Sequence, residues 1–138
     1  MAQVRVGVGV LVRRADGRVL LGVRQGAHGA EKLAFPGGHL ELMETWDQCA
    51  CREVEEETGL TIANTRHFAT TNDPMPEEQK HYITIFMEAD APAGVEPENR
   101  EPHKCKGWEW WSWGEIAAAR DRLFIPVQNL LAQHPNIS

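Results

Sequence analysis

The side chains best suited to do chemistry lie in the segment REVEEETG, which covers residues 52–59. Four of its eight residues are glutamates, namely Glu53, Glu55, Glu56 and Glu57. Carboxylates this close together repel one another unless a cation separates them. Clustered carboxylate oxygens suit hard divalent cations such as Mg²⁺ or Mn²⁺. The segment therefore raises the hypothesis of a metal-assisted reaction.

The helical periodicity of residues 46–58 places some of these carboxylates on the apolar side of the expected helix, where a solvent-exposed group of charges would not lie. The apolar side of the expected helix carries Trp46, Cys49, Ala50 and Val54. Glu53 and Glu57 fall on that same side, and Glu56 lies beside it. Glu55 points the opposite way, as in an ordinary solvated face. Buried carboxylates need a partner, and Arg52 is the only cation within the segment, so a bound divalent cation would supply the missing charge.

Local signals set the ends of this helix. Thr45 is a candidate N-cap, and Gln48 three residues later completes a capping box. Gly59 provides a C-terminal stop. We therefore expect a helix over residues 46–58.

The remaining segments predict a mixture of strands and helices. We expect strands over 4–12, 18–24, 67–72, 81–89 and 108–113, a loop over 73–80, a long connection over 90–107, and a final amphipathic helix with a break at 125–131. This order favours an α+β architecture with helices outside a mixed sheet. Gly7 and Gly9 alternate in the first strand, either because one face leaves room for a ligand or because of a bulge or tight packing.

Composition excludes several classes of protein. The chain has 138 residues, enough for one domain, which we expect to span residues 1–138. Its 14 Lys and Arg against 20 Asp and Glu give a net charge of -6, which argues against a binder of nucleic-acid polymers. No apolar run reaches the length of a membrane span, and the three cysteines lack metal-type spacing. We expect a cytoplasmic protein without a membrane partner.

A wider pattern surrounds the glutamates. The stretch GHLELMETWDQCACREVEEETGL, from Gly38 to Leu60, resembles the Nudix box with every fixed position filled. The segments GVGV, PGGHLE, HYITI and GWEWWSW extend this similarity to the small MutT-like nucleotide diphosphatases of animals and plants, over roughly residues 6–131. The resemblance implies the Nudix fold, an α/β/α sandwich around a mixed sheet.

The resemblance also implies roles for individual residues. The implied metal and catalytic carboxylates are Glu53, Glu56 and Glu57, with the Gly37 carbonyl as a further ligand. We favour Glu53 as the base and Glu56 and Glu57 as the main ligands. Glu44 and Arg52 match the pair that ties the loop to the helix.

The reaction implied is Mg²⁺- or Mn²⁺-dependent hydrolysis of a nucleoside triphosphate to the monophosphate and pyrophosphate. Oxidised or modified purine nucleotides such as 8-oxo-dGTP are candidate substrates, and many relatives of this kind are homodimers, which makes a homodimer the expectation here. Two alternatives stay open. One is a hydrolase of another diphosphate, such as a prenyl diphosphate, and the other is a Nudix module that binds a nucleotide without turnover.

The residues expected to contact substrate lie at the start of the box, just before it, and near the C-terminal end of the chain. They are Phe35, Gly38, His39, Leu123 and Phe124. Phe124 fits ordinary helix packing equally well, and His39 is either a phosphate contact or a structural hydrogen-bonding residue.

The segment EPHKCKGW departs from the relatives' pattern, since His103 and Lys106 stand where glutamates are expected. A late glutamate in this region is a metal ligand in MutT-like enzymes. Lys106 cannot ligate a metal as an ammonium ion but could contact a phosphate, and Glu98 or Glu101 are the possible substitutes.

Overall fold

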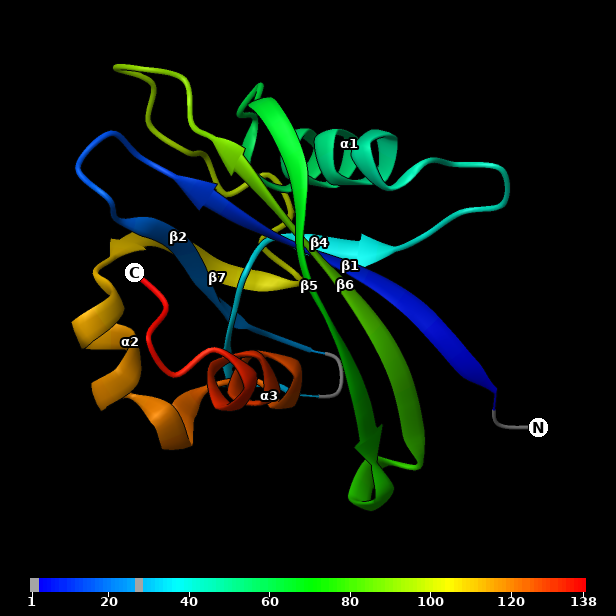
Figure 1. Ribbon diagram of the computed structural model, residues 1–138. Helices are drawn as coiled ribbons and strands as arrows, with labels where there is room; N and C mark the ends of the chain where they lie inside the picture. Colours follow the sequence, from blue (N-terminus) through cyan, green and yellow to red (C-terminus); the bar gives the residue numbers. More distant parts are fainter. Residues whose placement is uncertain (1–2, 27–28) are drawn as a thin grey trace.

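The computed structural model describes residues 3–26 and 29–138 (Figure 1). Its elements, in chain order, are β1 (Val4–Arg13), β2 (Val19–Arg24), β3 (Leu33–Ala34), β4 (Gly37–His39), α1 (Trp46–Thr58), β5 (Ala63–Met75), β6 (Lys80–Asp90), β7 (Cys105–Trp111), α2 (Trp113–Ala118) and α3 (Ile125–Gln133). Two short 3₁₀ turns lie at Pro76–Glu78 and Arg120–Arg122.

The described strands form one mixed sheet with β1 near its middle. The order is β3-β2-β1-β6-β5, with β4 paired to β1 and β7 paired to β2. The β1–β6 pair is parallel and aligns Gly7 with Thr84 and Gly9 with Phe86. The other pairs are antiparallel.

Apolar residues cover both faces of the sheet, and helices pack on each. One core cluster joins α1 to alternate residues of β1 and β6, including Val8, Val10, Val12, Cys49, Ala50, Val54, Ile85 and Met87. The other joins α2 and α3 to the opposite face, including Leu11, Leu21, Phe86, Ile116, Val127 and Leu130. Figure 1 shows α1 and α3 on opposite sides of the sheet. The expected α+β sandwich with a mixed sheet is confirmed.

Helix α1 has the bounds and caps that its sequence predicts. The Thr45 hydroxyl accepts a hydrogen bond from the Gln48 amide, and the Gln48 side chain accepts one from the Thr45 amide. Gly59 ends the helix in the left-handed conformation at φ 75°. Trp46 differs from expectation, because it is 42% exposed and packs on the His67 ring instead of entering the core.

Strand β5 is longer than predicted. Residues 73–75, expected in a loop, continue the strand and pair with β6, with Asp73 opposite Tyr82 and Met75 opposite Lys80. Pro74 is tolerated because β5 lies at the sheet edge, where its missing N–H can face outward. The hairpin therefore reaches further than local turn signals indicate.

The C-terminal region also differs from the prediction of one broken helix. It forms two helices, and the segment predicted as a break, 125–131, lies inside α3. Pro126 occupies the first turn of α3, where a backbone N–H is not needed. Among the described residues, none of the helices is long and apolar enough to cross a membrane.

The capping box predicts a measurable contribution to stability. Thr45→Ala should lower the free energy of unfolding by about 1 kcal/mol, because it leaves an amide of the first turn without a partner. Urea denaturation measures this, with Thr45→Ser as the matched control that keeps the hydroxyl. Equal stability of the alanine and serine variants would contradict a stabilising cap.

Candidate active site

The loop before α1 runs close to the sheet and to the helix. A Cβ atom on Gly37 would collide with the Val8 carbonyl oxygen, and one on Gly38 would collide with the Glu53 carboxylate. Strand β4 pairs with β1 through Gly37 opposite Gly9 and Gly38 opposite Val8. These glycines therefore allow a backbone approach that holds the loop beside the glutamates of α1.

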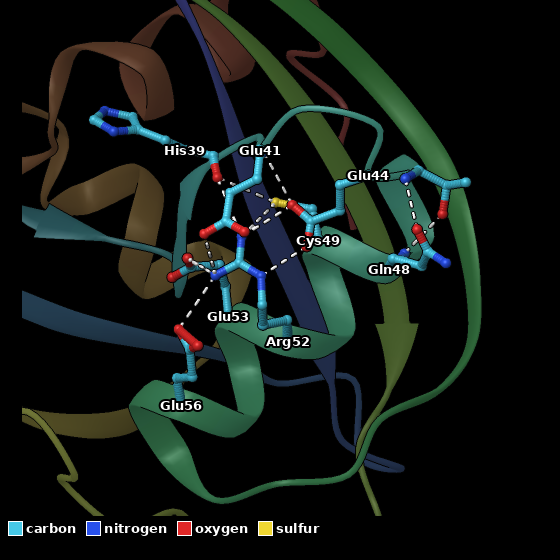
Figure 2. A network of polar contacts seen from close by, with 9 residues as sticks. His39, Glu41, Glu44, Gln48, Cys49, Arg52, Glu53 and Glu56 are labelled. Carbon is cyan, nitrogen blue, oxygen red and sulfur yellow. Dashed lines mark hydrogen bonds and ion pairs between the residues drawn. The ribbon is translucent and has the colours of Figure 1, made fainter.

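Arg52 connects the loop to the carboxylates (Figure 2). Its Nε and Nη2 donate to the two oxygens of Glu44 at 2.6 and 2.9 Å. The hydrogen bond from Arg52 lowers the pKa of Glu44 to about 2. This two-point contact fixes the orientation of the guanidinium and joins the loop to the helix.

The same guanidinium faces further carboxylates. Its Nη1 donates to Glu53 at 2.7 Å and to Glu56 at 3.2 Å, and lies 3.7 Å from Glu41. The side chain of Glu53 is 14% exposed and that of Glu56 is 49% exposed. One positive charge is thus shared among several negative ones.

Glu57 lies on the inner side of α1 and has no ion pair among the described residues. Its Oε1 accepts a hydrogen bond from the Gly37 amide at 2.9 Å. Burial raises the pKa of Glu57 to about 8, and the nearby charges of Glu53 and Glu101 act in the same direction. Burial also raises the pKa of Glu53, although Arg52 opposes this. Glu57 therefore has no compensating cation among the described residues, and Glu53 shares Arg52 with Glu44 and Glu56.

The donor set suits a hard divalent cation in its chemistry. Glu53, Glu56 and Glu57 are oxygen donors that line one cavity together with Glu101. Among the described residues, no three His, Cys, Asp or Glu side chains converge as a ready metal-binding group. Arg52 is hydrogen-bonded to Glu53 and Glu56, and the Gly37 amide to Glu57. Metal binding would require Glu53 and Glu56 to exchange Arg52 for the cation.

The cavity has a volume of about 640 Å³ and continues from the glutamates to an apolar end. Its wall includes Gly7, Gly9, Phe35, Tyr82, Thr84, Phe86, Trp108, Phe124, Pro126 and Val127. A Cβ on Gly9 would lie 3.1 Å from the Phe86 ring. The alternating glycines of β1 therefore line the cavity, and Gly9 also packs closely on β6.

The expected substrate residues are not all placed alike. Gly38, His39 and Phe124 line the cavity, and Phe35 lines it from the second core cluster, where it is 7% exposed. Leu123 does not belong to this set, because it is fully buried in that cluster and does not line the cavity. Along the extended backbone before α3, the side chain of Phe124 turns to the cavity while that of Leu123 enters the core.

His39 has a defined partner at the cavity. Its ring stacks on Tyr82 with the centroids 5.5 Å apart, and its Nε2 lies 3.0 Å from the Tyr82 hydroxyl. His39 is therefore paired with Tyr82 as a structural hydrogen-bonding residue would be, and it also lines the cavity, where a phosphate contact is expected.

The late segment places Glu101, rather than Lys106, at the site. Lys106 forms an ion pair with Glu31 at 2.7 Å and does not line the cavity, whereas Glu101 and Lys104 do. Of the two possible substitutes that the sequence offers, Glu98 and Glu101, it is Glu101 that lines the cavity.

Arg24 lines the cavity as well, with Cζ 4.1 Å from the centre of the Phe124 ring. Sequence reasoning missed this residue, because a cation at the end of a strand carries no local signal.

Comparisons with known proteins agree with this geometry. The NUDIX domain family matches residues 3–130. The 8-oxo-dGTP diphosphatase of Escherichia coli (strain K12) is 33% identical over 88 residues, which cover 63% of this chain and 65% of that protein. An NAD-capped RNA hydrolase NudC of Vibrio atlanticus is 36% identical over 108 residues, covering 78% of this chain and 39% of that protein. The chain thus spans less than two thirds of the length of either relative.

A solved structure has the same fold. The MutT NUDIX hydrolase of Burkholderia pseudomallei superimposes with a TM-score of 0.75 at 30% identity, over 82% of this chain and 86% of that one.

The raised pKa of Glu57 predicts a pH-dependent stability of the metal-free protein. A glutamate in an unfolded chain titrates near 4.3, so the folded state loses stability as pH rises from there to about 8. Glu57→Gln removes this loss and keeps an acceptor for Gly37. In chelator at about pH 8.5 its melting temperature should exceed that of the wild type by about 3 °C or more, corresponding to roughly 1 kcal/mol.

The gain should shrink at about pH 5, where Glu57 is largely protonated in the wild-type protein. Glu55→Gln, on the exposed side of the same helix, is the matched control and should show no such dependence. An equal gain at both pH values would show that burial of charge at position 57 is not its cause.

Proposed function

This chain belongs to the Nudix domain family, and from that premise we propose that it hydrolyses nucleoside triphosphates to the monophosphate and pyrophosphate with Mg²⁺ or Mn²⁺. The observation that carries the proposal is a single cavity of about 640 Å³ with under-compensated carboxylates at one end and aromatic and apolar walls at the other. Such a cavity suits a ligand with a phosphate chain and a flat base. Oxidised or modified purine nucleotides are proposed substrates because the Escherichia coli relative is an 8-oxo-dGTP diphosphatase.

The residues that would hold the cation are Glu53, Glu56 and Glu57, with the Gly37 carbonyl. When bound there, Mg²⁺ or Mn²⁺ would neutralise phosphate oxygens and lower the pKa of a water molecule. A triphosphate is repelled by the glutamates of the metal-free site, so the same charges that attract the cation make substrate binding depend on it.

Glu53 is the proposed general base. Its burial raises its pKa, which favours acceptance of a proton. The water oxygen forms a bond to phosphorus, the bond from that phosphorus to the leaving phosphate oxygen breaks, and Glu53 takes the water proton. Glu44 holds Arg52 by two hydrogen bonds, so the guanidinium stays in place when Glu53 turns away from it.

The opposite end of the cavity is proposed to hold the base. Phe35 and Phe124 offer aromatic surfaces, and Gly38 and His39 border the path between the base and the carboxylates. Arg24, stacked on Phe124, adds a cation beside this path.

We also propose that residues 1–138 act as one Nudix domain and that the chain forms a homodimer. Sedimentation at micromolar concentration tests the second proposal, and a monomer at all concentrations would contradict it.

A substrate panel with and without chelator tests the function. It contains the nucleoside triphosphates, oxidised and methylated guanine nucleotides, prenyl diphosphates and an NAD-capped RNA, each with Mg²⁺. We expect chelator-sensitive release of monophosphate and pyrophosphate from at least one nucleotide. Turnover of a prenyl diphosphate or of the capped RNA alone would contradict the proposal, and nucleotide binding without turnover would make the chain a binding module.

Glu53→Gln tests the base. It should lower kcat by about 10²- to 10⁴-fold, the usual contribution of a general base, while the melting temperature stays near that of the wild type. Steady-state kinetics at saturating Mg²⁺ measure it, with Glu55→Gln as the matched control on the exposed side of α1. A rate near that of the wild type would assign the base elsewhere.

A second comparison tests the late glutamate. Glu101→Gln should raise the Mg²⁺ concentration for half-maximal rate by roughly tenfold, because removal of one nearby negative charge weakens attraction for a divalent cation by more than 1 kcal/mol. Lys106→Glu should leave this concentration nearly unchanged, since Lys106 is paired with Glu31 outside the cavity. Tighter metal dependence in the Lys106 variant would mean that this chain has lost a ligand there.

A further inference from the structure

The C-terminal end of α1 carries charge of the sign that its dipole disfavours. Its last turn contains Glu55, Glu56 and Glu57 and no basic residue, although the carbonyl end of a helix favours positive charge. The last carbonyl groups of a helix also lack partners within the helix itself. The end of α1 therefore needs hydrogen-bond donors and a cation from elsewhere in the chain.

The connection between β6 and β7 supplies the donors. The Glu98 amide donates to the Thr58 carbonyl oxygen at 2.8 Å. The Arg100 amide donates to the Glu57 carbonyl oxygen at 3.1 Å, and the Trp108 indole N–H donates to the same oxygen at 3.2 Å. The backbone of this connection is thus hydrogen-bonded to the last turn of α1.

The Arg100 side chain supplies the cation. A Cβ atom on Gly59 would lie 2.9 Å from the Cζ, Nε and Nη2 atoms of Arg100, so the missing side chain of this glycine leaves room for the guanidinium. Its Nη1 is 3.5 Å from the Glu55 carbonyl oxygen, and its Nε is 3.5 Å from the Glu98 carboxylate. Arg100 therefore places a positive charge at the carbonyl end of α1.

Glu101 follows Arg100 directly and lines the cavity, which Arg100 does not. The Glu101 carbonyl oxygen accepts hydrogen bonds from the amides of Lys104 and Cys105 at 2.9 and 3.2 Å, which closes a tight turn. The charge of Glu101 adds to the effect of burial in raising the pKa of Glu57, so the two carboxylates lie close enough to interact. The carboxylate that this connection brings to the site is thus one residue from the contacts with α1.

We propose that Arg100 is a positioning residue that holds Glu101 beside the carboxylates of α1. The inference rests on the cation site of the proposed function and assigns a residue that completes it. Glu101 lies outside the strands and helices, so its place at the cavity depends on the contacts that its neighbours make. The guanidinium of Arg100 holds these neighbours to α1 through its charge and its packing on Gly59.

The sign of the effect on cation binding separates positioning from simple electrostatics. Arg100 is a positive charge near a site for a cation, so its removal alone would strengthen the attraction of Mn²⁺ to the site. Displacement of Glu101 would weaken this attraction, because one carboxylate fewer would face the cation. Weaker binding in Arg100→Ala is therefore a result that the loss of charge does not give.

Calorimetric titration of the full metal-free chain with Mn²⁺ tests the inference without turnover. Arg100→Ala should raise the dissociation constant by about threefold, less than the roughly tenfold expected for Glu101→Gln, which loses the carboxylate itself. In the Glu101→Gln background, Arg100→Ala should cause no further loss, because both substitutions act through one group. Lys106→Ala is the matched control. It removes a positive charge that is paired with Glu31 outside the cavity and should leave the constant nearly unchanged.

Two further variants keep the test independent of folding. Arg100→Lys keeps the charge at the helix end but loses the planar group that lies over Gly59, so it should bind Mn²⁺ more tightly than Arg100→Ala and less tightly than the wild type. Arg100→Gln keeps most of the side-chain length without the charge, and it replaces the alanine variant if that variant does not melt cooperatively.

Three outcomes would overturn the inference. They are unchanged or tighter Mn²⁺ binding in Arg100→Ala, an equal loss with and without the Glu101 carboxylate, and a wild type without saturable binding, which would remove the cation site as well. Failure of the proposed function is a separate result. A chain that binds Mn²⁺ in the expected pattern but releases no pyrophosphate from any nucleotide would contradict that function and leave the role of Arg100 intact.

Discussion

The site depends on a shortage of positive charge around one guanidinium. Arg52 contacts Glu44, Glu53 and Glu56 and lies near Glu41, while its full two-point contact goes to Glu44. Burial raises the pKa values of Glu53 and Glu57, and the charges of neighbouring carboxylates raise them further. A cluster of partly buried carboxylates is costly unless positive charge compensates it. Carboxylate oxygens suit a divalent cation for this purpose.

The rest of the fold holds this cluster against a cavity. The sheet separates α1 from α3, and β4, paired to the middle strand β1, brings the glycine loop to the carboxylates. Glycines at 37 and 38 permit contacts that any side chain would block. The apolar end of the cavity forms on the other face of the sheet, where α3 packs on β5. One cavity therefore contacts residues from both layers.

The sequence predicts well those structural features that neighbouring residues determine. The bounds of α1 follow from the Thr45 capping box, the apolar periodicity and Gly59, all within fourteen positions of one another. The length of β5 and the path of 119–133 depend on pairing with β6 and on packing, which no local pattern contains. The choice of Glu101 over Glu98 belongs to the same class, because it depends on which of the two lines the cavity, and spacing alone does not decide that.

The proposed chemistry requires the glutamates of α1 to bind a divalent cation in exchange for Arg52. Titration of the metal-free protein with Mn²⁺, followed by the electron paramagnetic resonance signal of free Mn²⁺, tests this most directly. We expect saturable binding to the wild type that weakens in Glu56→Gln and Glu57→Gln but not in Glu55→Gln. No saturable binding to the wild type, or equal binding to all four proteins, would contradict it.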